Sequence, residues 1–421
     1  MSLIFLCLEL ALLALLRFMG MEEIPDALAA ALILVYSFAY IACVSRKPHC
    51  EKYSAALIAG YLFRVALLFF DIYGENIYIL PNSGEDAKMF INNALRVTHG
   101  GTTARGAFPE LMGYFFRVFG ISRLFGQFVL MLCSMVSIEC AAKMFALIDL
   151  DEKKRSTALW LLCLLPNFAI LSSIFLRESL VTMFISLSML EYIKWVKHKS
   201  EVSFILAIAL TFGGMYFHTG AIAVPVGYLL SRILYDNKQE KIRISAQNLI
   251  ITFLLLLAGV FVLNRFGNSF LGQFANLDSI EDVAKVDNTG GSSYARYVGN
   301  SNNPVSMVIF TIPRMVFFLF SPMPWMIRGI SDIIAFCFSS CFYLITTIRT
   351  LRYLRKGEKE NRELVIVIFI VCLCAAFVFG WGTSNSGTAC RHRDKMTIVW
   401  GVLFGLTILP KQRKVQSAWL A

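Results

Sequence analysis

Apolar runs of close to 20 residues recur along the whole chain, separated by shorter polar segments. A helical run of this length crosses a hydrocarbon core of roughly 30 Å. A segment inside a bilayer has to satisfy its own backbone hydrogen bonds, which favours helices. The pattern predicts an all-α polytopic membrane protein of about twelve transmembrane helices, near residues 2–18, 27–45, 54–74, 124–147, 157–173, 178–196, 202–217, 220–236, 247–264, 331–349, 363–381 and 396–410.

The first apolar run has features that separate it from a secretory signal. Leu3 to Leu16 lacks the basic segment that opens such a signal, and it contains Glu9. We therefore expect an uncleaved first span. No soluble domain fits between the apolar runs, so residues 1–421 are expected to form a single integral membrane domain.

The basic residues predict which loops face the cytoplasm. Lys and Arg are enriched in cytoplasmic loops. They cluster here at Arg46 to Lys52, Lys153 to Arg155, Lys194 to Lys199, Lys238 to Arg243, Arg349 to Arg362 and Lys411 to Lys414. Placing all six clusters in the cytoplasm puts both termini there too, with Arg17 as an exception. The loops 75–123, 265–330 and 382–395 then face outward, as do short tips at Arg177-Glu178 and His218.

One further apolar run, residues 305–320, does not fit an even number of crossings. It contains Pro313-Arg314 and is followed by Ser-Pro-Met-Pro-Trp at 321–325. Proline interrupts helices, and irregular backbone at membrane depth needs cover from protein or water. We expect 305–325 to be a re-entrant or interfacial element on the outer face. The alternative is a true span at 305–320 with one neighbouring span misassigned.

Composition supports a membrane protein and excludes other classes. Hydrophobic residues make up 57% of the chain and charged residues only 16%, against about 25% charged in soluble domains. The net charge of +11 comes largely from the loop clusters, so it does not indicate nucleic acid binding. The 11 cysteines lie mostly in apolar runs without metal-ligand or disulfide spacing, which indicates apolar packing.

The segment 84–120 is the most informative part of the chain. Gly84-Glu85-Asp86 precedes apolar residues at helical spacing, so the two acidic residues open an amphipathic helix that Gly100-Gly101 ends. Phe108-Pro109 begins a second helix, closed by Gly120. Acidic residues are common in a first helical turn for electrostatic reasons alone. At a membrane surface, a carboxylate here is also placed to act as a general base on a sugar hydroxyl.

This segment resembles the first outer loop of GT-C glycosyltransferases. The likeness lies in GEDAKMFINNAL, the Gly pair, and FPELMGYFFRVFGIS. The resemblance implies a polyprenyl-phosphate- or diphosphate-linked sugar donor and a catalytic base at Asp86, or at Glu85. A second likeness at 166–185 combines Pro166, two serines and Arg177-Glu178, and implies a role for Glu178. The acidic loop follows the third predicted span rather than the first, which departs from the commonest members.

The general plan of the chain is also similar to bacterial polysaccharide repeat-unit polymerases of the Wzy type and related capsule or exopolysaccharide polymerases. They share about a dozen spans, large outer loops and outward arginines. Both resemblances imply glycosyl transfer from an undecaprenyl-type lipid-linked saccharide to a glycan acceptor. They place the protein in a bacterial plasma membrane, among membrane lipid, with the active site outside the cytoplasm.

Several basic residues of the predicted outer face suit such a donor. Guanidinium groups bind phosphate oxygens bidentately and can neutralise a diphosphate leaving group. The candidate substrate-binding residues are Arg177, His218, Arg314, Arg391, His392 and Arg393, joined by Lys395 in the last loop. A basic patch that faces solvent or lipid headgroups is the alternative for each arginine. For His218 the alternative is a helix-end histidine with a structural hydrogen bond.

Buried charges and metal chemistry remain to be considered. Arg64 lies within a predicted span two turns before Asp71, so we expect a structural ion pair inside the bundle, with Glu139 as a further candidate partner, rather than a catalytic role. No cluster has convincing metal spacing, although Glu85-Asp86 could hold a divalent cation together with a diphosphate.

Two other functions stay open. A lipid-linked oligosaccharide flippase predicts a charged path through the membrane. An outer-face acyl- or phospho-transferase predicts a role for His218-Thr219.

Overall fold

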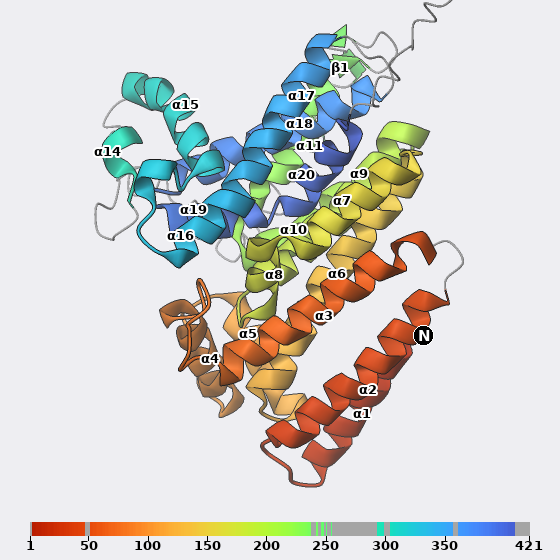
Figure 1. Ribbon diagram of the computed structural model, residues 1–421, viewed down its shortest axis with the longest axis vertical. Helices are drawn as coiled ribbons and strands as arrows, with labels where there is room; N and C mark the ends of the chain where they lie inside the picture. Colours follow the sequence, from red (N-terminus) through yellow and green to blue (C-terminus); the bar gives the residue numbers. More distant parts are fainter. Residues whose placement is uncertain are drawn as a thin grey trace, which may run out of the picture.

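The computed structural model describes residues 2–46, 51–236, 241–242, 246–247, 250, 254, 293–298, 304–356 and 361–408. These residues are almost entirely helical (Figure 1). The one strand pair is short and antiparallel, β1 (Tyr235–Asp236) with β2 (Lys241–Ile242). Most of the expected span at 247–264 lies outside the described residues, as do residues 265–292 and 299–303 of the expected loop 265–330.

The first half of the chain forms a bundle with one small helical pair beside it. The bundle contains α1 (Ser2–Phe18), α2 (Asp26–Ser45), α3 (Glu51–Tyr73), α6 (Arg123–Leu147), α7 (Glu152–Leu164), α8 (Pro166–Ser173), α9 (Glu178–His198) and α10 (Glu201–Phe217). The pair is α4 (Glu85–Thr98) and α5 (Ala107–Phe119), which pack on each other at the lower left of Figure 1.

The second half packs against α6, α7, α9 and α10 of the first. It contains η1 (Thr219–Ile222), α11 (Ala223–Leu234), α14 (Ala295–Val298), α15 (Pro304–Phe320), η3 (Pro324–Met326), α16 (Ile330–Ile334), η4 (Ala335–Ser340), α17 (Cys341–Lys356), α18 (Arg362–Trp381), α19 (Ser386–Asp394) and α20 (Thr397–Leu406). Helices α11 and α18 lie side by side, as do α15 and α18. One large apolar core joins the two halves.

Six helical segments of the described chain are long and apolar enough to cross a membrane. They are α2, the Tyr53–Tyr73 part of α3, α6, α9, the continuous stretch Ile330–Lys356, and α18. The α7–α8 pair, bent by 49°, would be a seventh. The expected spans at α1, α10, α11 and α20 correspond to shorter helices. The structure therefore confirms a helical membrane protein but not the expected twelve crossings.

Residues 305–320 differ from the expectation of an interrupted element. They lie in α15, which runs through Pro313 without a break. Pro313 removes only one backbone hydrogen bond from the helix. The packing of α15 on α18 stabilises the remaining turns. Irregular backbone begins only after Phe320, at Ser321 to Met323.

The bend between α7 and α8 has a clear physical cause. Pro166 has no amide hydrogen, so the last carbonyls of α7 lose their helical donor. The buried Arg64 guanidinium donates instead to the carbonyls of Cys163 (2.7 Å) and Leu162 (3.5 Å). The expected Arg64–Asp71 ion pair is wrong, because Asp71 pairs with Arg123 at 2.8 Å. Arg64 thereby stabilises the bend.

The α4–α5 pair follows the sequence expectation closely. Both acidic residues lie in the first turn of α4, and Gly100 follows this helix with a φ of 89°. Gly120 caps α5 with a φ of 92°. Gly113 allows the two helices to approach closely, since a Cβ there would lie 2.5 Å from the Cβ of Val97.

Candidate functional site

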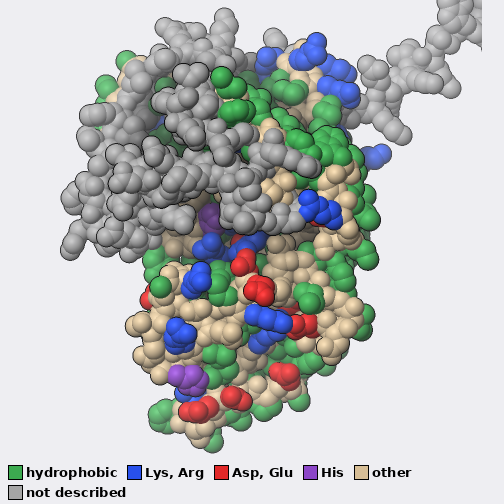
Figure 2. Space-filling model, turned by 90° about the vertical axis from the view of Figure 1, so that its left-hand side faces the viewer, with side chains coloured by type: hydrophobic (Ala, Val, Ile, Leu, Met, Phe, Trp, Pro, Cys, Tyr) green, Lys and Arg blue, Asp and Glu red, His purple; other side chains and the backbone are tan. Residues whose placement is uncertain are grey.

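Charged side chains from distant parts of the chain meet where α4, α9 and α19 approach one another. Asp86 comes from the first turn of α4, Arg177 and Glu178 from the break between α8 and α9, and Arg391 from α19. Figure 2 shows acidic, basic and histidine side chains gathered in the middle of this face. We call Asp86, Arg177, Glu178, His218, Arg391, His392 and Lys395 the charged cluster.

Arg391 joins two carboxylates of the charged cluster. Its Nε donates to Oε1 of Glu178 at 2.6 Å, and its Nη1 donates to Oδ2 of Asp86. The Glu178 side chain is 4% exposed and the Asp86 side chain 53% exposed. Arg391 therefore links a buried anion of α9 to an anion at the surface of α4. These two carboxylates raise the pKa of Arg391 against the effect of its burial.

Lys395 adds a second cation beside Glu178. Its Nζ lies 3.6 Å from Oε1 of Glu178, and the side chain is fully buried. Burial lowers the pKa of Lys395 to about 7, although the Glu178 carboxylate opposes this effect. Its ammonium has no hydrogen-bond partner within the described structure. A buried ammonium without a hydrogen-bond partner favours the binding of an anion beside it.

Arg177 supplies the third cation. Its guanidinium lies 5.7 Å from the centre of the Phe90 ring, and burial lowers its pKa. The Nε of Arg177 makes no hydrogen bond to the described residues. With Lys395 protonated, the charged cluster holds three cations and two carboxylates, one of them at the surface. This excess of buried positive charge is the electrostatic signature of an anion site.

The two histidines of the charged cluster face each other. The His218 and His392 rings meet edge to face with centroids 4.7 Å apart, and both contact Phe379. Burial and the neighbouring cations hold the pKa of both well below the usual range, so both are neutral. Nδ1 of His218 accepts a hydrogen bond from the Gly220 amide at 3.1 Å. The proton of neutral His218 is therefore on Nε2, which leaves that nitrogen as a donor.

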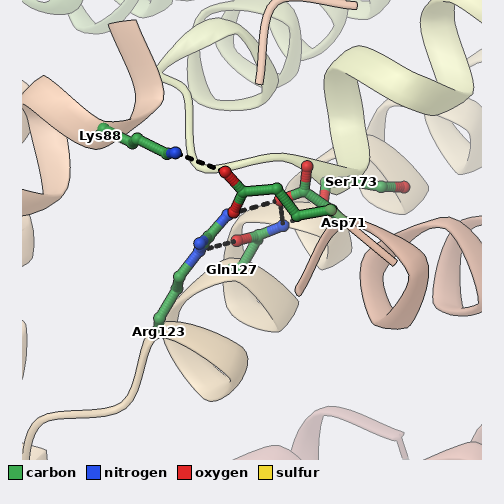
Figure 3. Close-up of polar contacts among 6 residues, drawn as sticks. Asp71, Lys88, Arg123, Gln127 and Ser173 are labelled. Carbon is green, nitrogen blue, oxygen red and sulfur yellow. Dashed lines mark hydrogen bonds and ion pairs between the residues drawn. The ribbon is translucent and has the colours of Figure 1, made fainter. Parts of the chain in front are cut away.

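A polar network fixes the break that carries Arg177 and Glu178. Asp71 accepts hydrogen bonds from Arg123 and Gln127, both at 2.8 Å (Figure 3). Gln127 also donates to the carbonyl of Ser173, the last residue of α8, at 2.5 Å. The ends of α3 and α8 are thus held to the start of α6. Lys88 of α4 pairs with Glu75 at one side of this network (Figure 3).

Not every predicted site residue joins the charged cluster. Glu85 is exposed and makes no ion pair or hydrogen bond through its side chain within the described chain. Arg314 donates to the Trp381 carbonyl at 3.2 Å and lies over the Trp381 ring. Arg393 donates to the carbonyls of Phe318, Leu319 and Ser321 and to the hydroxyls of Ser339 and Ser340. Arg393 therefore holds α19 to the end of α15 and to η4.

Sequence reasoning did not anticipate two features of the charged cluster. The contact of Lys395 with Glu178 joins residues from α9 and from the end of α19, so no local pattern signals it. Phe379 lies on α18 within an apolar run, where nothing distinguishes it from its neighbours. The packing of α18 against α19 and η1 places it beside the histidines.

The described residues can also be compared with the ligand set that a metal site needs. Among the described residues, no three His, Cys, Asp or Glu side chains lie close enough to hold a metal ion. Asp86 is instead engaged by Arg391, and Glu178 by Arg391 and Lys395.

The chemistry that these groups can perform is anion binding, proton acceptance by Asp86 and hydrogen-bond donation by His218. No protein-family model matches the chain, and none of the curated proteins matches it.

Proposed function

We propose that this protein is a membrane glycosyltransferase of polysaccharide biosynthesis that acts on the extracytoplasmic face. It transfers a sugar or oligosaccharide from a polyprenyl-(di)phosphate donor to a glycan acceptor. The observation that carries the proposal is the charged cluster, in which buried cations exceed buried carboxylates beside a half-exposed carboxylate. A lipid-linked donor brings a phosphate anion to a site within a membrane protein, and cations there stabilise the leaving group.

The roles follow from the positions of the side chains. Arg391, Arg177 and protonated Lys395 bind the phosphate, and Glu178 holds Arg391 and Lys395 in place. The acceptor hydroxyl attacks the anomeric carbon, and its proton passes to Asp86. The bond between that carbon and the phosphate oxygen breaks, and the phosphate keeps the electron pair. His218 donates from Nε2 to a phosphate or sugar oxygen.

The proposal includes the topology expected from the basic loops. In addition to the six long apolar segments and the α7–α8 pair, the shorter helices α1, α10, α11 and α20 cross the membrane in this proposal. The sequence predicts one further crossing at 247–264, most of which lies outside the described residues. Both termini are cytoplasmic in this arrangement, and α4, the α8–α9 break and α19 lie on the outer side. The charged cluster is then on the side of the membrane where the proposed donor is used.

The test is transfer by the purified protein. Reconstituted in nanodiscs with defined polyprenyl-diphosphate oligosaccharides, it should release polyprenyl diphosphate and lengthen the glycan. Arg391→Ala should strongly reduce release, whereas Arg105→Ala, at an exposed site outside the charged cluster, should not. Movement of the intact donor across vesicles without release would instead indicate a flippase. Transfer of an acyl or phosphoryl group would indicate the third class of enzyme.

A further inference from the structure

The contact between Asp86 and Arg391 suggests where the donor binds within the charged cluster. Resting on the proposed function, we infer that the Asp86 carboxylate occupies the position of a donor phosphate group. Donor binding displaces Asp86 from Arg391 and thereby releases it as the proton acceptor.

The two ion pairs of Arg391 differ in strength. Glu178 is buried and also lies beside Lys395, so separating it from Arg391 would leave a carboxylate buried without its main partner. Asp86 is 53% exposed, and an ion pair with one such partner contributes little because water solvates the released carboxylate. An arriving anion therefore replaces Asp86 and leaves Glu178 in place.

The donors of Arg391 also favour a phosphate at this position. Nε is used by Glu178, and Asp86 takes only Nη1. Nη2 makes no hydrogen bond to any described residue. Nη1 and Nη2 form the end-on edge of a guanidinium, which two phosphate oxygens match in a bidentate pair. A phosphate would thus use both donors where the Asp86 carboxylate uses one.

Displacement would change the chemistry of Asp86. Paired with Arg391, its Oδ2 is occupied by the hydrogen bond from Nη1. Once a phosphate takes the guanidinium, this oxygen is free to accept a hydrogen bond from the acceptor hydroxyl. The acceptor hydroxyl then gives its proton to Asp86 as its oxygen bonds the anomeric carbon and the phosphate leaves. This coupling keeps the base occupied until the donor has bound, so the donor binds first.

The inference is tested by binding of inorganic diphosphate to the full-length protein in detergent, measured by calorimetry at constant salt. Asp86→Asn removes the competing anion, so affinity should rise roughly two- to fivefold, the size expected for an ion pair with one exposed partner. The matched control is Glu85→Gln, which removes the same charge one residue away without removing a contact. It should leave the affinity close to that of the wild type. Arg391→Ala should bind weakly or not at all.

The outcomes separate this inference from the proposed function. If the wild type binds diphosphate and Asp86→Asn binds it no more tightly, the displacement of Asp86 is wrong and the anion site stands. Equal tightening by Glu85→Gln also overturns the displacement, because it would reflect overall charge. If no variant binds diphosphate, the anion site and the inference both fail. Tighter binding by Asp86→Asn in a protein without glycosyl transfer would support the displacement and overturn the transferase.

Discussion

The carboxylate of Glu178 accepts a hydrogen bond from Nε of Arg391 at 2.6 Å, although the two residues are 213 positions apart in the chain. Both side chains are largely buried, at 4% and 12% exposed. A buried ion pair contributes little net stability unless its surroundings complete its hydrogen bonds. Oε2 of Glu178 has no such partner in the described structure. The pair therefore adds little to the net stability of the fold, as expected if its role is in the proposed anion site.

The first prediction concerns Arg391. Replacing it with alanine should cost about 1.5–3 kcal/mol in donor binding, the size expected for hydrogen bonds to a charged group. Arg391→Lys should restore little, because an ammonium cannot reproduce the planar fork. The measurement is KM and kcat for release of polyprenyl diphosphate. Wild-type kinetics for Arg391→Ala at normal protein levels would contradict the role of this residue.

The second prediction concerns pH. The pKa of Lys395 is lowered to about 7, so Lys395 is cationic below this pH and neutral above it. Anion affinity should therefore be higher at pH 6 than at pH 8. The histidines should not contribute in this range, because the pKa of each lies well below the usual value.

A titration of diphosphate binding checks this prediction. Lys395→Met should flatten the profile, whereas His218→Gln should keep its shape. Bound anion favours the protonated lysine, so the midpoint should move upward with ligand. A profile that persists in Lys395→Met would assign the titration to another group.

The third prediction separates Arg393 from Arg391. Arg393 satisfies the carbonyls of Phe318, Leu319 and Ser321. Arg393→Ala should destabilise the fold by about 1–3 kcal/mol for each buried carbonyl left without a donor. Thermal unfolding in detergent should show a lower Tm, while the affinity of Arg393→Ala for diphosphate stays close to that of the wild type. A stable Arg393→Ala protein with a specific loss of donor affinity would return Arg393 to the ligand site.

The contrast between these two arginines shows what the sequence could not resolve. They are two residues apart on α19, and side chains at that spacing do not share a helix face. The run Arg391 to Lys395 indicates an anion site but not which face of the helix meets Glu178. That depends on how α19 packs on α9, a long-range contact. The sequence alone made Arg391 and Arg393 equal candidates for binding the donor, and the packing of α19 distinguishes them.

Local patterns predicted helices more reliably than they predicted crossings. The positions of Glu85, Asp86 and Gly100 were enough to place α4, because helix starts and stops depend on neighbouring residues. The number of spans depends on helix length, and α20 has only 10 residues against the roughly 20 of a full crossing. Pro313 predicted a break in α15 that the structure lacks, because packing on α18 supports the helix through it.

The last prediction assigns the proton acceptor. Asp86 lies half-exposed at the edge of the charged cluster, with Arg391 as its partner, where an acceptor hydroxyl can reach it. Asp86→Asn keeps the size of the side chain and removes its basicity. It should lower kcat about 10²–10⁴-fold, the usual contribution of a general base, while donor binding persists or tightens. Glu178→Gln should instead weaken donor binding and lower the Tm, since Glu178 holds Arg391 and Lys395 in a buried position. Both variants are compared by kcat, by KM and by binding of inorganic diphosphate. A fully active Asp86→Asn beside an inactive Glu178→Gln that still binds donor would move the base to Glu178. Full activity in both would remove the residue-level support for glycosyl transfer, because no other carboxylate of the described chain contacts Arg391.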